Sequence, residues 1–122
     1  IDVDDWEKST QYSTRGCLKK NHEVSTWFWQ IVRNDFTDEQ RARLLQFSTG
    51  SANVPVGGFK ELQTHSGNTC PFTILGVPLS QKKYPGAHTC FNRLELPIYT
   101  SKKELRQNLM VSIEMEMRLD LE

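Results

Sequence analysis

Residues 85–97 have the sequence PGAHTCFNRLELP. Pro85 and Gly86 are typical of a turn, because proline restricts the backbone and glycine frees it. The residues from His88 to Leu96 predict a short strand, and Pro97 ends it because proline cannot donate to a sheet. The sequence therefore predicts a loop that enters a strand, with Cys90 near their junction.

Two further short strands are predicted upstream of this stretch. Residues 72–75, FTIL, form a short apolar run between polar loops. The pair Gly57-Gly58 predicts a turn that leads into a strand over residues 59–62.

The first predicted helix covers residues 23–34. Its apolar residues recur at i, i+3, i+4, i+7 and i+8, which places them on one face of a helix; they are Val24, Trp27, Phe28, Ile31 and Val32. Trp29 lies off this face, so we expect it to meet a second surface.

A second helix is predicted to begin at Thr37 and to end at Gly50. Thr37 and Gln40 have the spacing of a capping box, in which each side chain bonds to the other residue's backbone N–H. Gly50 is typical of a helix C-terminus. Arg41 and Arg43 are assigned to the solvated face of this helix.

A third helix is predicted after Ser101, which forms another capping box with Glu104. Beyond Ile113, apolar and polar residues alternate to Glu122. The period of two predicts an extended tail, whereas the residue types are good helix formers, and both readings stay open. The fold class is α+β: a small mixed sheet of three to four short strands packed with amphipathic helices.

The N-terminal stretch IDVDDWEKSTQY, residues 1–12, predicts one or two helical turns, since acidic residues suit a helix N-terminus. Its large apolar residue is Trp6, and we expect no nearby element to bury it. The polar residues that follow predict a linker. The compact unit is expected to begin at about Cys17.

The composition excludes several classes of function. The 122 residues carry 15 basic and 15 acidic side chains, so a general electrostatic attraction to nucleic acid or to an anionic membrane is unsupported. No apolar run approaches the roughly 18 residues of a membrane span. The chain begins at Ile1, without a signal peptide, which predicts a piece of a longer protein. The odd count of three cysteines favours a reducing compartment over a disulfide scaffold.

Cys90 is the candidate nucleophile, because a loop-to-strand junction is reachable and His88 would share a face with it in an extended chain. Local spacing alone does not decide between a nucleophile and a structural cysteine beside a surface histidine. On that basis the structural cysteine is favoured. Cys17 and Cys70 are read as ordinary residues. The spacing of cysteines and histidines fits no zinc motif, and no phosphate loop or dinucleotide motif occurs.

Five blocks then make the sequence recognisable. They are WFW at 27–29, FTDEQRARLLQFSTGS at 36–51, VPVGGF at 54–59, FTI at 72–74 and HTCFNRLELP at 88–97. In this order and spacing they closely resemble the C-terminal lobe of HECT-type ubiquitin ligases. The resemblance implies that residues 1–16 are the end of the preceding N-terminal lobe and the hinge between the lobes, and that residues 17–122 are the C-terminal lobe.

The resemblance also implies a function. Cys90 would accept ubiquitin from a conjugating enzyme as a thioester and pass it to a lysine amine of a protein substrate. His88 and Thr89 would shape and polarise the site, and Phe91 and Asn92 would belong to the active-site loop. The implied partners are ubiquitin, a conjugating enzyme bound through the N-terminal lobe, and protein substrates. No cofactor or metal is implied, and the expected location is the cytoplasm, with the nucleus as a second option.

The family's C-terminal tail takes part in transfer, which implies a role for Leu119, Asp120 and Glu122. Leu119 stands where phenylalanine is usual, and the usual glycines around it are absent. This departure favours one alternative, a non-catalytic ubiquitin-binding module of the same fold. A second alternative is a lobe that conjugates a ubiquitin-like modifier.

Overall fold

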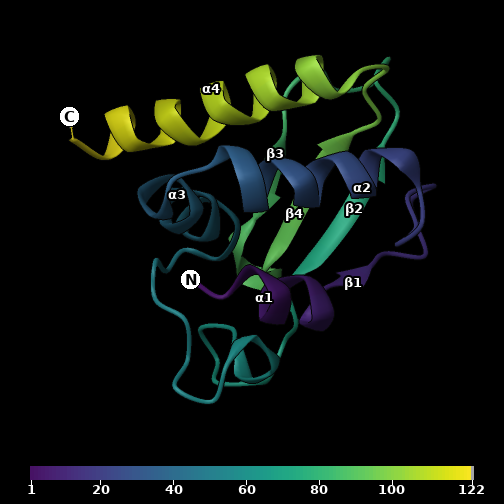
Figure 1. Cartoon of the computed structure of the whole chain (residues 1–122). Helices are drawn as coiled ribbons and strands as arrows, with labels where there is room; N and C mark the ends of the chain where they lie inside the picture. The colour runs from purple at the N-terminus through teal and green to yellow at the C-terminus, as the bar shows by residue number, and fades with distance from the viewer. Residues whose placement is uncertain (122) are drawn as a thin grey trace.

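The computed structural model describes residues 1–121. In the described chain, four α-helices pack with one four-stranded sheet, which confirms the predicted α+β class (Figure 1). The helices are α1 (Val3–Ser9), α2 (Glu23–Gln30), α3 (Asp38–Thr49) and α4 (Lys102–Leu121). The strands are β1 (Gln11–Tyr12), β2 (Thr73–Val77), β3 (Gly86–His88) and β4 (Arg93–Pro97).

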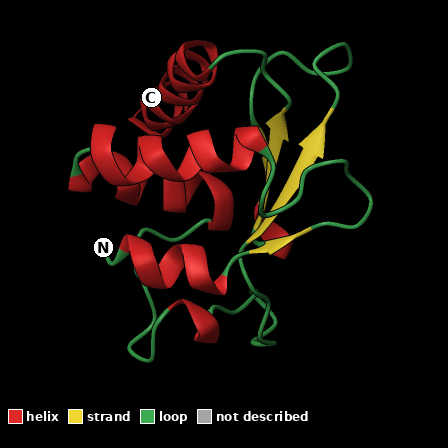
Figure 2. Cartoon of the chain, turned by 45° about the vertical axis from the view of Figure 1, so that its right-hand side comes forward, coloured by secondary structure: helices red, strands yellow, loops and turns green. Residues whose placement is uncertain are grey.

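The sheet is mixed and has the order β1-β2-β4-β3. β1 and β4 both run parallel to β2, and β3 runs antiparallel to β4. The helices lie on one side of the strands (Figure 2). Between the two layers lies a core of fully buried side chains, which includes Phe28, Ile31, Leu44, Leu45, Ile74, Leu94, Leu96 and Leu105.

The predicted helix over 23–34 is confirmed, and its last turn is wider than an α-helix. α2 continues directly into a π-helical segment, η1 (Ile31–Asp35), in which the Phe36 N–H donates to the Ile31 carbonyl at 3.0 Å. Trp29 is buried, as its place off the main face predicted.

The capping box of α3 is present in both directions. The Gln40 N–H donates to Thr37 Oγ1 at 3.2 Å, and the Thr37 N–H donates to Gln40 Oε1 at 2.9 Å. Gly50 ends the helix with φ of 84°, a conformation that glycine adopts without strain. The local signals in this part of the sequence therefore predicted both helix ends.

Two of the predicted strands are wrong in detail. Residues 59–62 contain a 3₁₀-helix, η2 (Phe59–Glu61), because the turn at Gly58 directs the Phe59 ring into the core beneath Trp6. The predicted strand 88–96 is divided into β3 and β4 by a second 3₁₀-helix, η3 (Thr89–Phe91). Asn92 adopts a left-handed conformation after η3, which an extended chain cannot contain.

At the C-terminus the backbone is helical to Leu121, so the structure favours the helical reading of the alternating residues over the extended one. Glu122 lies outside the described residues. Among the described helices, none is both long and apolar enough to cross a membrane.

The expectation that Trp6 has no packing surface is wrong. Its side chain is fully buried, because α1 lies against η2 and the indole packs on Phe72, the residue before β2. The indole stacks on Phe59 with ring centres 5.1 Å apart and meets Trp29 and Phe72 edge-on. β1 then joins the sheet beside β2. Residues 3–12 are thus packed into the same core, while the assignment of residues 1–16 to a preceding lobe and hinge stays a prediction.

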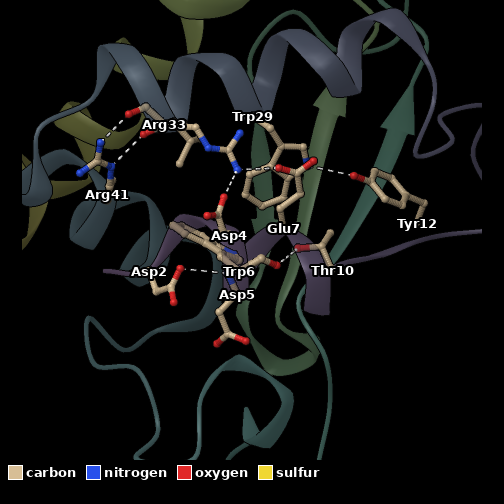
Figure 3. Close-up of polar contacts among 11 residues, drawn as sticks. Asp2, Asp4, Asp5, Trp6, Glu7, Thr10, Tyr12, Trp29, Arg33 and Arg41 are labelled. Carbon is tan, nitrogen blue, oxygen red and sulfur yellow. Dashed lines mark hydrogen bonds and ion pairs between the residues drawn. The ribbon is translucent and has the colours of Figure 1, made fainter.

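Polar contacts also join α1 to η1, and β1 to α2 (Figure 3). One guanidinium nitrogen of Arg33 lies 2.7 Å from Asp4 and 2.8 Å from Glu7. Nearby, the indole N–H of Trp29 donates to the Tyr12 hydroxyl at 2.9 Å. Because their side chains are partly exposed, each of these ion pairs contributes little to the free energy of unfolding. The polar contacts therefore orient α1, and the buried aromatic rings stabilise its position.

Candidate active site

Cys90 lies at the centre of η3, the single 3₁₀ turn between β3 and β4. Its side chain is exposed and its thiol is free. The Asn92 N–H donates to the Thr89 carbonyl at 3.3 Å and closes the turn. The two paired strands thus hold a reachable thiol at one end of the sheet.

Thr89 precedes Cys90 and is half-buried where η3 packs against the end of α3. A Cβ atom built on Gly50 would lie 3.8 Å from the Thr89 Cβ. The C-terminus of α3 therefore supports one side of the turn.

Asn92 follows the turn and is 1% exposed. Its side-chain nitrogen donates to the carbonyl of Cys70 at 2.9 Å and to that of Gln63 at 3.2 Å. Its backbone carbonyl accepts from the N–H of Thr73 at the start of β2. The end of the turn is therefore fixed to two neighbouring segments.

The loop that contains residues 64–70 faces the turn across a surface groove of about 440 Å³. The Cys70 thiol donates to the Phe91 carbonyl at 3.3 Å, which joins the two walls of the groove. The lining residues are Thr64, His65, Ser66, Asn68, Thr69, Cys70, Cys90 and Phe91. Cys90 thus lines an open groove on the surface.

His88 does not share a strand face with Cys90, because η3 begins directly after His88. Its Nε2 instead lies 3.1 Å from a carboxylate oxygen of Glu95, on the paired strand β4. The Lys82 ammonium lies 3.6 Å from the same oxygen. The expectation that His88 and Cys90 share one face of an extended strand is therefore wrong. A role for His88 in the reaction stays a prediction.

Phe91 has an exposed ring, with 57% of its surface accessible. The Arg93 guanidinium lies 5.6 Å from the ring centre, within the range of a cation–π contact. The ring forms part of the surface beside the thiol and lies outside the core.

The structure brings together four of the predicted residues, Thr89, Cys90, Phe91 and Asn92, with His88 one step before them. Leu119 and Asp120 lie on the helical backbone of α4, and Glu122 lies outside the described residues. The described residues contain no cluster of three or more His, Cys, Asp or Glu side chains that could hold a metal ion.

Sequence reasoning missed the second wall of the groove. Cys70 was read as an ordinary loop residue, yet its thiol and its carbonyl both bond to the segment that carries Cys90. The two segments are about twenty residues apart in sequence, and no local pattern indicates that they meet.

The family model described as HECT-domain (ubiquitin-transferase) matches residues 1–122. The chain belongs to the HECT family. It is 45% identical over 116 residues to the E3 ubiquitin-protein ligase pub1 of Schizosaccharomyces pombe, which covers 93% of this chain and 14% of that protein. It is 45% identical over 114 residues to the E3 ubiquitin-protein ligase RSP5 of Saccharomyces cerevisiae, with 93% and 13% covered.

A third HECT relative is the E3 ubiquitin-protein ligase Nedd-4 of Drosophila melanogaster. It is 46% identical over 116 residues, with 93% of this chain and 11% of that protein covered. The chain therefore spans roughly an eighth of the length of the curated relatives it matches.

Proposed function

We propose that this chain is the catalytic C-terminal lobe of a HECT-type ubiquitin ligase and that Cys90 is its nucleophile. The observation that carries the proposal is the exposed, free thiol of Cys90 on a short turn beside a groove. Membership of a ubiquitin-transferase family and similarity to named E3 ubiquitin-protein ligases support it.

The first step is an exchange between two thiols. The Cys90 thiolate attacks the thioester carbonyl that joins the C-terminus of ubiquitin to the conjugating enzyme, and the enzyme's thiolate leaves. Because one thioester replaces another, the step needs a reachable thiolate and correct positioning more than a driving force.

The second step forms an isopeptide bond. A lysine amine of a protein substrate attacks the thioester on Cys90, loses a proton, and displaces the Cys90 thiolate. Replacing a thioester by an amide is strongly downhill, so the protein has mainly to orient the amine. His88 and Thr89 shape the site in this proposal, and Leu119, Asp120 and Glu122 contribute to this second step.

A reducing compartment suits this chemistry, because the nucleophile must remain a thiol. Cys17, Cys70 and Cys90 are all free, which supports a location in the cytoplasm or the nucleus. The partners of the proposal are ubiquitin, a conjugating enzyme and protein substrates.

Three single variants of the full-length protein that contains this chain test the nucleophile. With a ubiquitin-charged conjugating enzyme, Cys90→Ala should abolish the adduct that a thiol reductant removes. Cys70→Ala and Cys17→Ala are the matched controls and should keep this adduct, because neither replaces the exposed thiol of η3.

An adduct that survives Cys90→Ala and disappears in Cys70→Ala would contradict the assignment. Ubiquitin binding without an adduct in the unmodified protein would favour the non-catalytic module. An adduct formed only with a ubiquitin-like modifier would favour the other alternative, a lobe that conjugates such a modifier.

A further inference from the structure

The side chain of Asn92 is buried and rigidly placed, although it belongs to a turn at the surface. It is 1% exposed, and its backbone has φ of 50° and ψ of 43°. Asparagine adopts this left-handed region more readily than most residues other than glycine. Backbone conformation alone would therefore accept glycine at this position, and it leaves the buried amide unexplained.

Both hydrogens of the Asn92 amide are used in bonds to a neighbouring segment of the chain. Their acceptors are the carbonyls of Gln63 and Cys70, which lie at the two ends of the loop that forms the opposite wall. One planar group thus fixes both ends of this loop relative to the residue that closes the catalytic turn.

Further bonds show that Cys70 has little freedom to move. Its N–H donates to the Leu62 carbonyl at 2.8 Å, and its thiol donates to the Phe91 carbonyl. Movement of the Asn92 amide would therefore displace Cys70, its contact with Phe91 and the turn that carries Cys90.

We propose that Asn92 is a positioning residue that sets the distance between the Cys90 thiol and the opposite wall of the groove. The inference rests on the proposed function of Cys90. The amide does not touch the reacting atoms; it acts through the loop between Gln63 and Cys70. Its role is to present the thiol in one geometry to the incoming thioester, and small errors in such geometry are costly to rate.

The first test is Asn92→Asp in the full-length protein. The shape of the side chain is kept, but a carboxyl group has at most one O–H donor when neutral and none when ionised, so it cannot donate to two carbonyls. In single-turnover reactions with a saturating charged conjugating enzyme, the rate constant for the adduct on Cys90 should fall on the order of ten- to hundredfold. The adduct amplitude and the half-saturating enzyme concentration should be unchanged.

Asn53→Asp is the matched control, because it makes the same chemical change at an exposed loop position. It should leave the rate constant within about twofold of the unmodified protein, as expected for a surface change away from the site. A similar fall in both variants would overturn the inference, since added charge would then explain the effect.

Asn92→Gly distinguishes the role of the side-chain amide from that of the backbone conformation. It removes the amide, and glycine adopts the left-handed conformation without strain. This variant should retain the amplitude and lose rate as Asn92→Asp does. A normal rate in Asn92→Gly would overturn the inference, as would a loss of amplitude with a normal rate constant in both variants. Failure of the unmodified protein to form the adduct would instead refute the proposed function.

Discussion

Arg41 combines three hydrogen bonds in one guanidinium group. Nε donates to the Val32 carbonyl at 2.8 Å, Nη2 to the Arg33 carbonyl at 2.7 Å, and Nη1 to Asp38 at 2.9 Å. The two carbonyls belong to η1, so the side chain satisfies acceptors that the end of a helix leaves free. The assignment of Arg41 to the solvated face of α3 is therefore wrong, because its charged group faces the preceding helix.

Replacing Arg41 by lysine should lower the free energy of unfolding by about 1–2 kcal/mol, since a compact ammonium cannot reproduce the two-carbonyl fork. Urea denaturation at neutral pH measures this change. Arg43→Lys is the matched control: one guanidinium nitrogen of Arg43 pairs with the exposed carboxylate of Glu39, four residues earlier, and such helix pairs contribute about 0.3–0.5 kcal/mol. Equal losses in the two variants would contradict the role given to Arg41.

Tyr99 provides a pH-dependent contribution to stability. Burial, with a smaller effect of the nearby Glu104 charge, raises the pKa of its hydroxyl well above the usual range. The hydroxyl donates to the Lys83 carbonyl at 2.6 Å. The neutral form of Tyr99 is therefore favoured in the folded state. Its contribution to the free energy of unfolding is fully present below the pKa of tyrosine in the unfolded chain, about 10.

As the pH rises above about 10, the unfolded chain ionises Tyr99 first, so the free energy of unfolding should fall with pH. Tyr99→Phe should be less stable at neutral pH and should lose less stability between pH 9 and 11, which denaturation at several pH values measures. Burial also raises the pKa of Tyr12, which accounts for part of the remaining slope. An unaltered slope in Tyr99→Phe would contradict the interpretation.

The elements divide into those that sequence predicts and those that it does not. α2 and α3 were predicted because their periodicity and caps lie within a few residues of each helix. η2 and η3 were missed because Gly58 and Asn92 take conformations set by distant groups, such as the Asp5 carboxylate that accepts from the Phe59 N–H. The candidate nucleophile was predicted, whereas the opposite wall of its groove depends on contacts between distant segments.

Trp6 anchors α1 to the remaining elements, so it should dominate the stability of this contact. Trp6→Ala should cost about 3–5 kcal/mol, because a large buried ring leaves a cavity that the core cannot fill. Thermal and urea unfolding would measure the loss. Trp6→Phe keeps one aromatic ring and should lose less, which keeps the test useful if the alanine variant does not fold.

The matched control is Trp27→Ala, at a position that is only partly buried. It should cost clearly less than Trp6→Ala. A loss below about 1 kcal/mol at Trp6 would show that α1 contributes little to the core.

At the scale of the whole molecule, α4 is the longest helix described, and it packs on α2 and α3. In Figure 1 its C-terminal end extends past α3, away from β2 and β4.

Deleting residues 119–122 from the full-length protein tests the role proposed for the tail. Thioester formation on Cys90 should be unchanged, and isopeptide formation should slow, because only the second step uses the tail to place the amine. Following the two steps separately by gel analysis measures both rates. Unchanged isopeptide formation would exclude a role of the tail, and equal loss of both steps would indicate damaged folding.

The burial of Trp6 has an optical consequence. Two indoles in edge-on contact, with ring centres 5.9 Å apart, lie in a fixed asymmetric arrangement where α1 meets α2. One indole N–H is bonded to Tyr12, and the other, on Trp6, is buried without a hydrogen-bond partner among the described residues. Undocking α1 would bring the Trp6 indole into water and separate the pair. The near-ultraviolet circular dichroism and the fluorescence emission of the native chain would therefore report α1 docking without an added label.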